Sequence, residues 1–346
     1  MSLKLNDPGL LKSHSYINGE WVDNGATLEV TNPANGELIT EVGIVGAEQT
    51  AQAIAAADQA MQLWKARPAK ERANLLRGWY DLIMANQEDL AILMTTEQGK
   101  VLAESRGEIA YAASFIEWFS EEARRFYGDV VALPQTDRRG VVIKQPVGVV
   151  AAITPWNFPA AMITRKAGPA LAVGCAIVIK PASETPLSAL ALAELADRAG
   201  LPAGLLNVVV GSSREIGPVL TGSDTIRKLT FTGSTPVGKS LLKECADTVK
   251  KVSMELGGNA PVIVFDDADL DAAVAGAAAS KYRNSGQTCI CANRILVQDS
   301  VYDEFVAKFT ETVKGYRLGD GLDENSTHGP VVTTKAAQDI DAMVQE

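Results

Sequence analysis

Histidine and cysteine are both scarce in this chain of 346 residues, which has two histidines and four cysteines. Two histidines leave little for a histidine-based metal site, and the Cys-x-Cys at 289 and 291 lacks the second ligand pair of a structural zinc site. Four cysteines are also too few for a disulfide scaffold in a chain of this length. We therefore expect no metal and a reducing compartment, the cytoplasm.

Long apolar runs are absent as well. No stretch reaches the roughly 20 apolar residues that a membrane helix needs. The longest candidate, residues 167–179, is interrupted by Pro169 and two glycines, and it predicts the end of a buried helix followed by a strand. The first residues lack the unbroken apolar core of a signal peptide. We expect no membrane partner.

Positive charge is in deficit, with 32 Lys and Arg against 42 Asp and Glu and a net charge of −10. This balance argues against nucleic acid as a partner, and any anionic ligand must be held by a few local cations. A content of 47% hydrophobic and 21% charged residues is typical of a globular protein. The length predicts about two domains.

The first half of the chain changes character three times. Residues 16–45 alternate short apolar runs with Asn-Gly turns, as small antiparallel strands do, and residues 47–127 follow a helical pattern with few breakers. Residues 128–146 predict two strands around an Asp-Arg-Arg-Gly turn. We expect that hairpin to stand apart from the helices.

From residue 147 onward, strands and helices alternate. A helix is predicted over 187–199, where apolar residues recur at helical spacing before Gly200 stops it. Such alternation is typical of βαβ units and of a parallel sheet covered on both faces, so the fold class is α/β. The chain ends within an amphipathic helix, and we expect a further segment to follow it. The predicted strands lie at 147–154, 175–180, 205–210, 228–231 and 261–265.

A glycine-rich turn follows the predicted strand at 228–231. It contains Gly233 and Gly238, and a helix is predicted to begin at residues 235–236. Free backbone N–H groups at a helix start attract phosphate, and glycine lets the phosphate approach closely. The spacing is not that of a known dinucleotide or nucleoside-triphosphate fingerprint. Taken alone, the turn therefore fits an ordinary strand-to-helix connection at least as well.

Lys180 and Ser183 follow another predicted strand, and open parallel sheets bind ligands at the carboxyl ends of their strands. Lys180 can donate to ribose hydroxyls or to a phosphate. An acidic residue at this place would bind the free 2′-hydroxyl of NAD and repel a 2′-phosphate. Ser183 does not repel it, although Glu184 follows. A solvated strand end is the alternative interpretation.

Three further residues have side chains suited to catalysis. Cys289, flanked by small residues, is either a nucleophile or a buried inert thiol, and its chemistry alone does not distinguish it from Cys291. Glu255, beside a Gly-Gly turn, is either a desolvated general base or a strand end facing solvent. Asn157, between two prolines, either donates to a developing oxyanion or completes a turn.

The order of these motifs closely resembles the aldehyde dehydrogenase superfamily, and within it the bacterial NADP-dependent succinate-semialdehyde dehydrogenases. The resemblance runs from Asn18 to Pro330. Chance recurrence of the whole set in order is negligible. The motifs are Pro-Trp-Asn-Phe-Pro at 155–159, Lys-Pro-Ala-Ser at 180–183, Phe-Thr-Gly-Ser at 231–234, Glu-Leu-Gly-Gly-Asn at 255–259 and Gly-Gln-Thr-Cys at 286–289.

This resemblance implies a catalytic role for three residues. Cys289 is the nucleophile, and the Asn157 amide together with the Cys289 backbone N–H holds the oxyanion. Hydride transfer to the nicotinamide leaves a thioester, which water activated by Glu255 hydrolyses to a carboxylic acid. Related enzymes with a Cys-x-Cys pair can form a disulfide that blocks the nucleophile. For Cys289 and Cys291 that is a hypothesis, beside a packing role for Cys291.

The resemblance also implies the cofactor. Ser183 stands where NAD-specific members often have glutamate, which favours NADP, with NAD as a second possibility. The residues that match cofactor-lining positions of the family are Trp156, Lys180, Ser183, Gly233, Ser234 and Leu256.

The substrate that the resemblance implies depends on two arginines. In succinate-semialdehyde dehydrogenases, arginines matching Arg165 and Arg283 grip the distal carboxylate of the substrate, a task that suits the paired N–H donors of guanidinium. The alternative is that both form surface or interdomain ion pairs. Glutarate semialdehyde is one methylene longer, which is worth only about 1–3 kcal/mol in discrimination. The sequence does not separate the two substrates.

The resemblance implies three structural parts. A Rossmann-type dinucleotide-binding domain is expected at 1–127 and 147–256, and a bridging hairpin at 128–146 takes part in a homodimer or homotetramer. Residues 257–346 are expected to form the N-terminal part of an incomplete α/β catalytic domain, because family members are longer. Two alternatives follow. One is a fragment that binds dinucleotide without turnover, and the other is an acylating enzyme that uses coenzyme A, which Glu255 disfavours.

Overall fold

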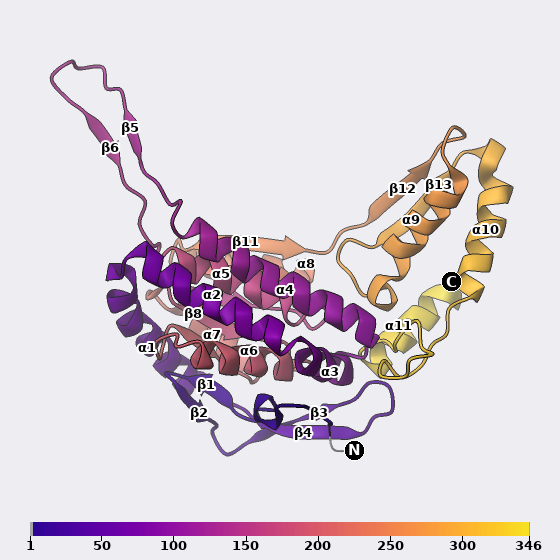
Figure 1. The fold of residues 1–346 in the computed structure, drawn as a ribbon, viewed down its shortest axis with the longest axis horizontal. Coiled ribbons are helices and arrows are strands. Elements are labelled where there is room, and N and C mark those ends of the chain that lie inside the picture. The colour runs from indigo at the N-terminus through magenta and orange to yellow at the C-terminus, as the bar shows by residue number, and fades with distance from the viewer. Residues whose placement is uncertain (1–2, 346) are drawn as a thin grey trace.

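A single mixed sheet forms the centre of the molecule (Figure 1). The structure is a computed structural model and describes residues 3–345. The sheet has seven strands in the order β11-β10-β7-β8-β9-β1-β2, and the first five are parallel. These five are β7 Val149–Ile153, β8 Ile177–Lys180, β9 Leu206–Val208, β10 Ile226–Gly233 and β11 Lys251–Leu256.

The parallel strands follow the order of a dinucleotide-binding half, 3-2-1-4-5, when they are counted along the chain from β7. Right-handed crossovers place the first two connecting helices on one face of the sheet and the last two on the other. The order therefore reverses between β7 and β10. The helices are α5 Ala161–Ala172, α6 Pro186–Arg198, α7 Ser213–Gly222 and α8 Thr235–Ala246.

Burial on both faces explains why these strands have no polar alternation. All residues of β8 and β9 are buried, and so are four of the five residues of β7. A strand covered by helices on both sides is apolar along most of its length, and the one buried polar residue of β9, Asn207, donates to the carbonyl of Gly204 at 2.7 Å. The α/β class with a Rossmann-type parallel sheet, predicted from the sequence, is confirmed.

The N-terminal region adds two edge strands and a layer of helices. β1 Ser15–Ile17 pairs antiparallel with β9 and with β2 Glu20–Val22, so these two strands extend the main sheet. β3 Thr27–Thr31 and β4 Leu38–Gly43 form a separate pair. The sequence predicted the small strands but not the joining of two of them to the central sheet. The helices are α1 Ala47–Ala66, α2 Ala69–Ala85, α3 Gln87–Gln98 and α4 Leu102–Glu122.

Two buried tryptophans fix the helical layer to the sheet domain. The Trp64 indole N–H donates to the carbonyl of Leu171 at 2.8 Å, and that of Trp79 donates to the carbonyl of Leu192 at 3.1 Å. Each large apolar ring is therefore buried with its one polar atom satisfied. As a result, α1 and α2 are joined directly to α5 and α6.

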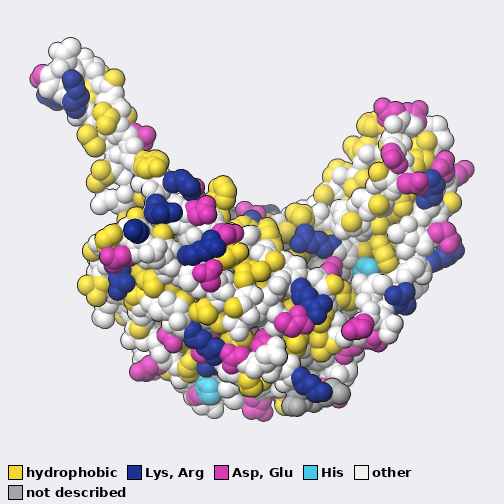
Figure 2. Space-filling model, viewed as in Figure 1, with side chains coloured by type: hydrophobic (Ala, Val, Ile, Leu, Met, Phe, Trp, Pro, Cys, Tyr) yellow, Lys and Arg dark blue, Asp and Glu magenta, His cyan; other side chains and the backbone are white. Residues whose placement is uncertain are grey.

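A hairpin projects from this body at the upper left of Figure 1, as the sequence predicted. It consists of β5 Asp129–Val131 and β6 Gly140–Val142, with Val130 opposite Val141. Val130 is 76% exposed and Val141 69% exposed. Figure 2 shows hydrophobic side chains along much of this arm.

The last quarter of the described chain builds a second, smaller cluster. β12 Ala260–Val264 and β13 Ala292–Val297 pair in parallel, next to α9 Leu270–Tyr282 and α10 Tyr302–Lys314. Their buried side chains form a hydrophobic core of their own. The helix α11 Thr334–Gln345 comes last, and short 3₁₀ turns lie at Pro8–Leu10, Arg283–Gly286 and Asp299–Val301. The domain boundaries drawn from the sequence stay predictions.

No helix within residues 3–345 is long and apolar enough to cross a bilayer.

Candidate active site

The carboxyl ends of the parallel strands meet along one edge of the sheet. β7 runs into the Pro-Trp-Asn-Phe-Pro segment, β8 ends at Lys180, β10 ends at Gly233 and β11 ends at Leu256. A parallel sheet brings all such ends to the same side, and the crevice opens where the strand order reverses. Residues that are far apart in the sequence therefore line one region.

A groove of about 670 Å³ lies on this edge between α7 and α8. Lys180 forms part of its wall. Burial lowers the pKa of Lys180, against an opposing effect of Glu184, and its ammonium donates to the carbonyl of Pro181 at 3.1 Å. An ammonium has three donors, so two remain for a ligand. Ser183 lies three residues further on, half-buried in the turn before α6.

Arg214 lines the same groove and was not identified from the sequence. It lies in the first turn of α7 and is exposed. The groove also contains two carboxylates, Glu244 and Asp247, at the far end of α8, so any cationic part of it is confined to the end with Lys180 and Arg214.

The turn after β10 has the geometry that the sequence predicted. Thr235 begins α8, and Ser234 is its N-cap residue. Glycine is needed here, because a Cβ at Gly233 would lie 2.5 Å from the ring of Phe231, and one at Gly238 would lie 2.6 Å from Leu256. Leu256 thereby packs against α8 next to the turn. The free N–H groups at the start of α8 face the same edge of the sheet as the strand ends.

Cys289 lines a second cavity, of about 370 Å³. Trp156 and Asn157 line this cavity, and so do Gly233 and Ser234. The structure thus brings the expected nucleophile, the expected oxyanion donor and three expected cofactor residues together. Cys289 is exposed, whereas Cys175, Cys245 and Cys291 are buried.

The backbone before Cys289 adopts an uncommon conformation. Asn284 and Ser285 have φ angles of 51° and 55°, in the left-handed region. Two contacts from other parts of the chain hold this turn. The backbone N–H of Asn284 donates to Glu104 at 2.8 Å, and the hydroxyl of Ser285 donates to the carbonyl of Gly329 at 2.7 Å. The position of Cys289 therefore depends on α4 and on the segment near 329.

The amide of Asn157 already has one partner. Its Nδ2 donates to the backbone carbonyl of Gln287 at 2.9 Å. A side-chain amide carries two N–H donors, so one remains for the cavity. The expected oxyanion donor is therefore joined to the loop of the nucleophile, two residues before Cys289.

Glu255 does not line the Cys289 cavity, contrary to the arrangement expected for a base beside its nucleophile. It lines a neighbouring cavity of about 390 Å³ with Arg165 and Lys166. Side chains alternate along a strand, and Met254 and Leu256, its neighbours on β11, pack on the main core instead. Glu255 itself is exposed.

Lys166 and Thr232 form the wall between the two cavities. The Lys166 ammonium donates to the hydroxyl of Thr232 at 2.6 Å, and Thr232 lines the Cys289 cavity. Burial, together with the neighbouring Arg165, lowers the pKa of Lys166 to about 8, while Glu255 acts in the opposite direction. A titratable ammonium, hydrogen-bonded to a hydroxyl, thus lies between Glu255 and the Cys289 cavity.

The two arginines expected to hold a substrate carboxylate lie apart. Arg165 lines the Glu255 cavity, with its guanidinium 5.2 Å from the ring centre of Phe115. Arg283 is exposed and lies 4.9 Å from the ring centre of Phe158, a residue of the Cys289 cavity. Both guanidinium groups stack on aromatic rings, which holds a cation at low cost.

Cys291 is hydrogen-bonded rather than bridged to Cys289. Its sulfur contacts the hydroxyl of Thr288 and donates to the carbonyl of Gly286 at 3.3 Å. These contacts support the packing role; the redox hypothesis stays a hypothesis. Within residues 3–345, no group of three or more His, Cys, Asp or Glu side chains is arranged to hold a metal ion.

The comparisons with known proteins all indicate one family. The sequence profile of the Aldehyde dehydrogenase family matches residues 21–346. The chain is 61% identical to the glutarate-semialdehyde dehydrogenase of Pseudomonas putida KT2440, over 99% of this chain and 72% of that protein. It is 59% identical to the NADP(+) succinate-semialdehyde dehydrogenase GabD of Escherichia coli K12, with the same coverage.

Solved structures agree with this comparison. An NADP-dependent enzyme of E. coli has a TM-score of 0.98 to this chain at 59% identity, covering 99% of this chain and 72% of that one. The chain therefore spans about 72% of the length of these relatives.

The exposure of the four thiols predicts their reactivity. Burial raises the pKa of Cys175 and of Cys245, and only the thiolate is alkylated. Under limiting iodoacetamide, we expect at least roughly tenfold faster labelling of Cys289 than of Cys175, Cys245 or Cys291, measured by peptide mass spectrometry. Labelling in about 6 M guanidinium chloride, where burial is lost, is the control and should make the four rates similar. Equal rates in the folded protein would contradict this site.

Proposed function

This chain belongs to the aldehyde dehydrogenase family, and from that premise we propose that it oxidises the semialdehyde of a short dicarboxylic acid to the dicarboxylate, with Cys289 as the nucleophile. The observation that supports this proposal most directly is the cavity that exposed Cys289 shares with Asn157 and with the Gly233 turn. A reactive thiol, an oxyanion donor and an anion-binding helix start are the parts that this reaction needs.

In the proposed reaction, the Cys289 thiolate adds to the aldehyde carbon, and the carbonyl electron pair moves to oxygen. The free N–H of Asn157 and the Cys289 backbone N–H stabilise that oxyanion. A bound dinucleotide supplies the hydride acceptor. Loss of hydride from the adduct leaves a thioester on Cys289. Water then attacks the thioester as Glu255 takes its proton, and the thiolate leaves as the carboxylic acid is released.

The role proposed for Glu255 requires a movement of its side chain. In the structure it lies in the cavity with Lys166. Glu255 is exposed, and its side chain is proposed to rotate past Lys166 and Thr232 toward the thioester. The Lys166 ammonium, with a pKa of about 8, lies in the same cavity as its starting position.

The proposed cofactor is NADP, with NAD as the weaker alternative. Lys180 has unused donors beside the groove, and Ser183 brings no negative charge that would repel a 2′-phosphate. Arg214 adds a second cation to the groove wall. Trp156, Gly233, Ser234 and Leu256 are proposed to line the nicotinamide half, at the start of α8. These donors fit a phosphorylated dinucleotide.

The proposed substrates are succinate semialdehyde and its homologue with one more methylene, glutarate semialdehyde. One relative is named for each, at 59% and 61% identity. Arg283, beside Phe158 at the Cys289 cavity, is the nearer candidate for the distal carboxylate. Arg165 is proposed to assist from the adjoining cavity, which its contact with Met162 supports, since Met162 lines the Cys289 cavity.

We also propose that the protein is a homodimer or homotetramer of the cytoplasm. The projecting hairpin β5–β6 supports this assembly, because it exposes apolar side chains on a two-stranded unit that is marginal alone.

The activity predicts a specific dependence on Cys289. With NADP and succinate semialdehyde, Cys289→Ser should lower kcat by at least roughly a thousandfold and leave NADP affinity unchanged, while Cys245→Ala on α8 should retain activity. Replacing the substrate by butanal, which lacks the distal carboxylate, should lower kcat/KM by roughly 30-fold or more, the value of a charge-assisted contact. Steady-state absorbance of the reduced dinucleotide measures each rate.

The competing functions give different results in that assay. Dinucleotide binding without turnover would support a binding fragment, and turnover that requires coenzyme A would support an acylating enzyme. The ratio of kcat/KM for succinate and glutarate semialdehyde should correspond to a free-energy difference of no more than about 3 kcal/mol.

The groove predicts a role for Arg214 in cofactor choice. Arg214→Ala should weaken NADP binding about fivefold and NAD binding less than about twofold, because an exposed cation contributes about 1 kcal/mol to a phosphate contact. Fluorescence titration with both dinucleotides measures the difference. Arg227→Ala is the matched control, since exposed Arg227 lies near the amino end of β10, at the opposite edge of the sheet. Equal losses for NADP and NAD would contradict the assignment.

The hairpin predicts the assembly. Val130→Lys with Val141→Lys should shift the mass measured by light scattering toward the monomer, because two charges would replace exposed apolar side chains that the proposed interface buries. Val249→Lys, at an exposed turn before β11, is the control. A wild-type protein that is monomeric at every concentration would contradict the proposal.

A further inference from the structure

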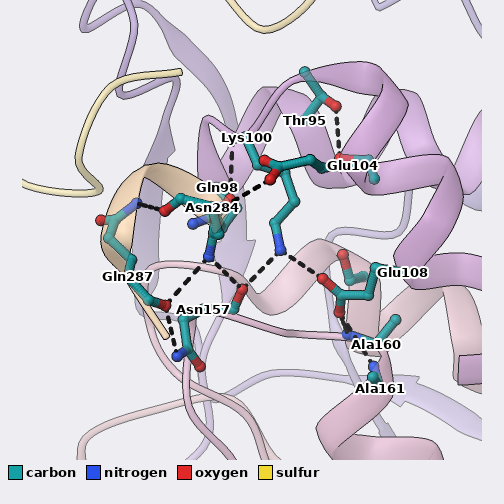
Figure 3. A network of polar contacts seen from close by, with 12 residues as sticks. Thr95, Gln98, Lys100, Glu104, Glu108, Asn157, Ala160, Ala161, Asn284 and Gln287 are labelled. Carbon is teal, nitrogen blue, oxygen red and sulfur yellow. Dashed lines mark hydrogen bonds and ion pairs between the residues drawn. The ribbon is translucent and has the colours of Figure 1, made fainter. Parts of the chain in front are cut away.

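A buried ion pair lies behind the candidate active site (Figure 3). Lys100, between α3 and α4, donates to Glu108 at 2.5 Å, and both side chains are only 1% exposed. The same ammonium donates to the backbone carbonyl of Asn157 at 2.7 Å. It also lies 4.3 Å from the ring centre of Phe158. A cation from the N-terminal helices thus holds the segment that bears the oxyanion donor.

The other oxygen of Glu108 holds the same segment further along. Its Oε1 accepts the backbone N–H groups of Ala160 and Ala161, at 3.0 and 3.2 Å, at the start of α5. Lys100 and Glu108 therefore fix the segment on both sides of Phe158. Desolvation of a buried ion pair often cancels its Coulomb energy, and such a pair is weak evidence for stability. Its position points to a task in the site.

Asn284 connects this network to the loop of the nucleophile. Its Nδ2 donates to the carbonyl of Asn157 at 3.0 Å and lies 3.4 Å from the carbonyl of Gln287. The amide of Asn157 also donates to the carbonyl of Gln287. The two segments are therefore joined in both directions, by contacts that lie beside the reacting groups.

The consequence for Asn157 is a single orientation. Lys100 and Asn284 donate to the backbone carbonyl of Asn157, and the backbone carbonyl of Gln287 accepts one of the two N–H groups of its side-chain amide. The orientation of the second side-chain N–H of Asn157 relative to Cys289 is thereby fixed. Oxyanion stabilisation depends on donors that are already oriented when charge develops, and a misplacement of about 1 Å can cost roughly a hundredfold in rate.

We propose that Lys100, paired with Glu108, is a positioning residue for the reaction: its ammonium fixes the Asn157 segment against the Cys289 loop and so orients the oxyanion donor. This inference rests on the proposed function. It assigns no contact between Lys100 and substrate.

The test uses variants that keep the fold. Lys100→Met with Glu108→Gln removes both charges together, so no buried charge is left unpaired, and the new amide at position 108 still offers an oxygen to Ala160 and Ala161. Asn284→Gly removes the second donor to the Asn157 carbonyl from the other side, and glycine tolerates the φ of 51° at that position. Arg106→Met with Glu88→Gln is the matched control, a pair between α4 and α3 that is 47% and 45% exposed.

Two reactions of Cys289 separate positioning from thiol reactivity. p-Nitrophenyl acetate acylates the thiolate through a tetrahedral oxyanion, in which the sulfur–carbon bond forms and the ester carbon–oxygen bond breaks to release p-nitrophenolate. Iodoacetamide alkylates the same thiolate by displacement of iodide, and no oxyanion forms. The burst of p-nitrophenolate and the alkylation rate are measured for every variant, with NADP affinity and thermal unfolding as checks of the fold.

We expect the Lys100/Glu108 double variant to lose about 10- to 100-fold in acylation rate, and its alkylation rate to stay within about threefold of wild type. Asn284→Gly should show the same split, and the Arg106/Glu88 control should show neither loss. Equal acylation by wild type and the double variant would overturn the inference, and so would a parallel fall in both rates. A wild-type protein that is alkylated but neither acylated nor active with semialdehyde would overturn the proposed function itself.

Discussion

Parallel alignment of five strands in one sheet is the constraint on which the candidate site depends. Because β7, β8, β10 and β11 all end at the same edge, their carboxyl ends bring Asn157, Lys180, Gly233 and Leu256 to one region from distant positions in the sequence. The strand order reverses between β7 and β10, and the groove and the Cys289 cavity lie at that edge. No single segment of the chain contains this site.

The proposed nucleophile comes from outside the sheet, so its position has a different cause. Cys289 lies on a loop of the second, smaller cluster, and that loop contacts the sheet domain through the carbonyls of Asn157 and Gln287. Asn284 supplies the reciprocal donor, and Glu104 and Lys100 from the N-terminal helices hold both sides. Three regions of the chain therefore meet at one set of partly buried hydrogen bonds. The buried Oδ1 of Asn284 has no hydrogen-bond partner, so this residue joins the network through its Nδ2 and its backbone N–H.

The separation of Glu255 from Cys289 follows from the period of a strand. On β11, Leu256 faces α8 near the Gly233 turn, so Glu255 faces the other way, toward Arg165 and Lys166. β11 thus lines the Glu255 cavity, and Gly257, the residue that follows it, lines the Cys289 cavity, with Thr232 and Lys166 between the two. The same arrangement places Arg165 with Glu255 and leaves Arg283 beside the Cys289 cavity. The proposed base and the proposed nucleophile therefore lie in adjacent but distinct cavities.

The sequence by itself determined the α/β class, the alternation of strands and helices from residue 147, and the projecting hairpin, since these depend on local periodicity and turn residues. Motif order also indicated Cys289, Asn157 and the Gly233 turn. Lys100 and Glu108 were not identified from the sequence, because the backbone groups that they hold lie 57 and 52 residues away. The available signal for a functional role of Glu108 was its i, i+4 spacing from Glu104 on a predicted helix. Only tertiary structure decided which cavity each side chain enters, because strand direction and long-range hydrogen bonds leave no local trace in a sequence.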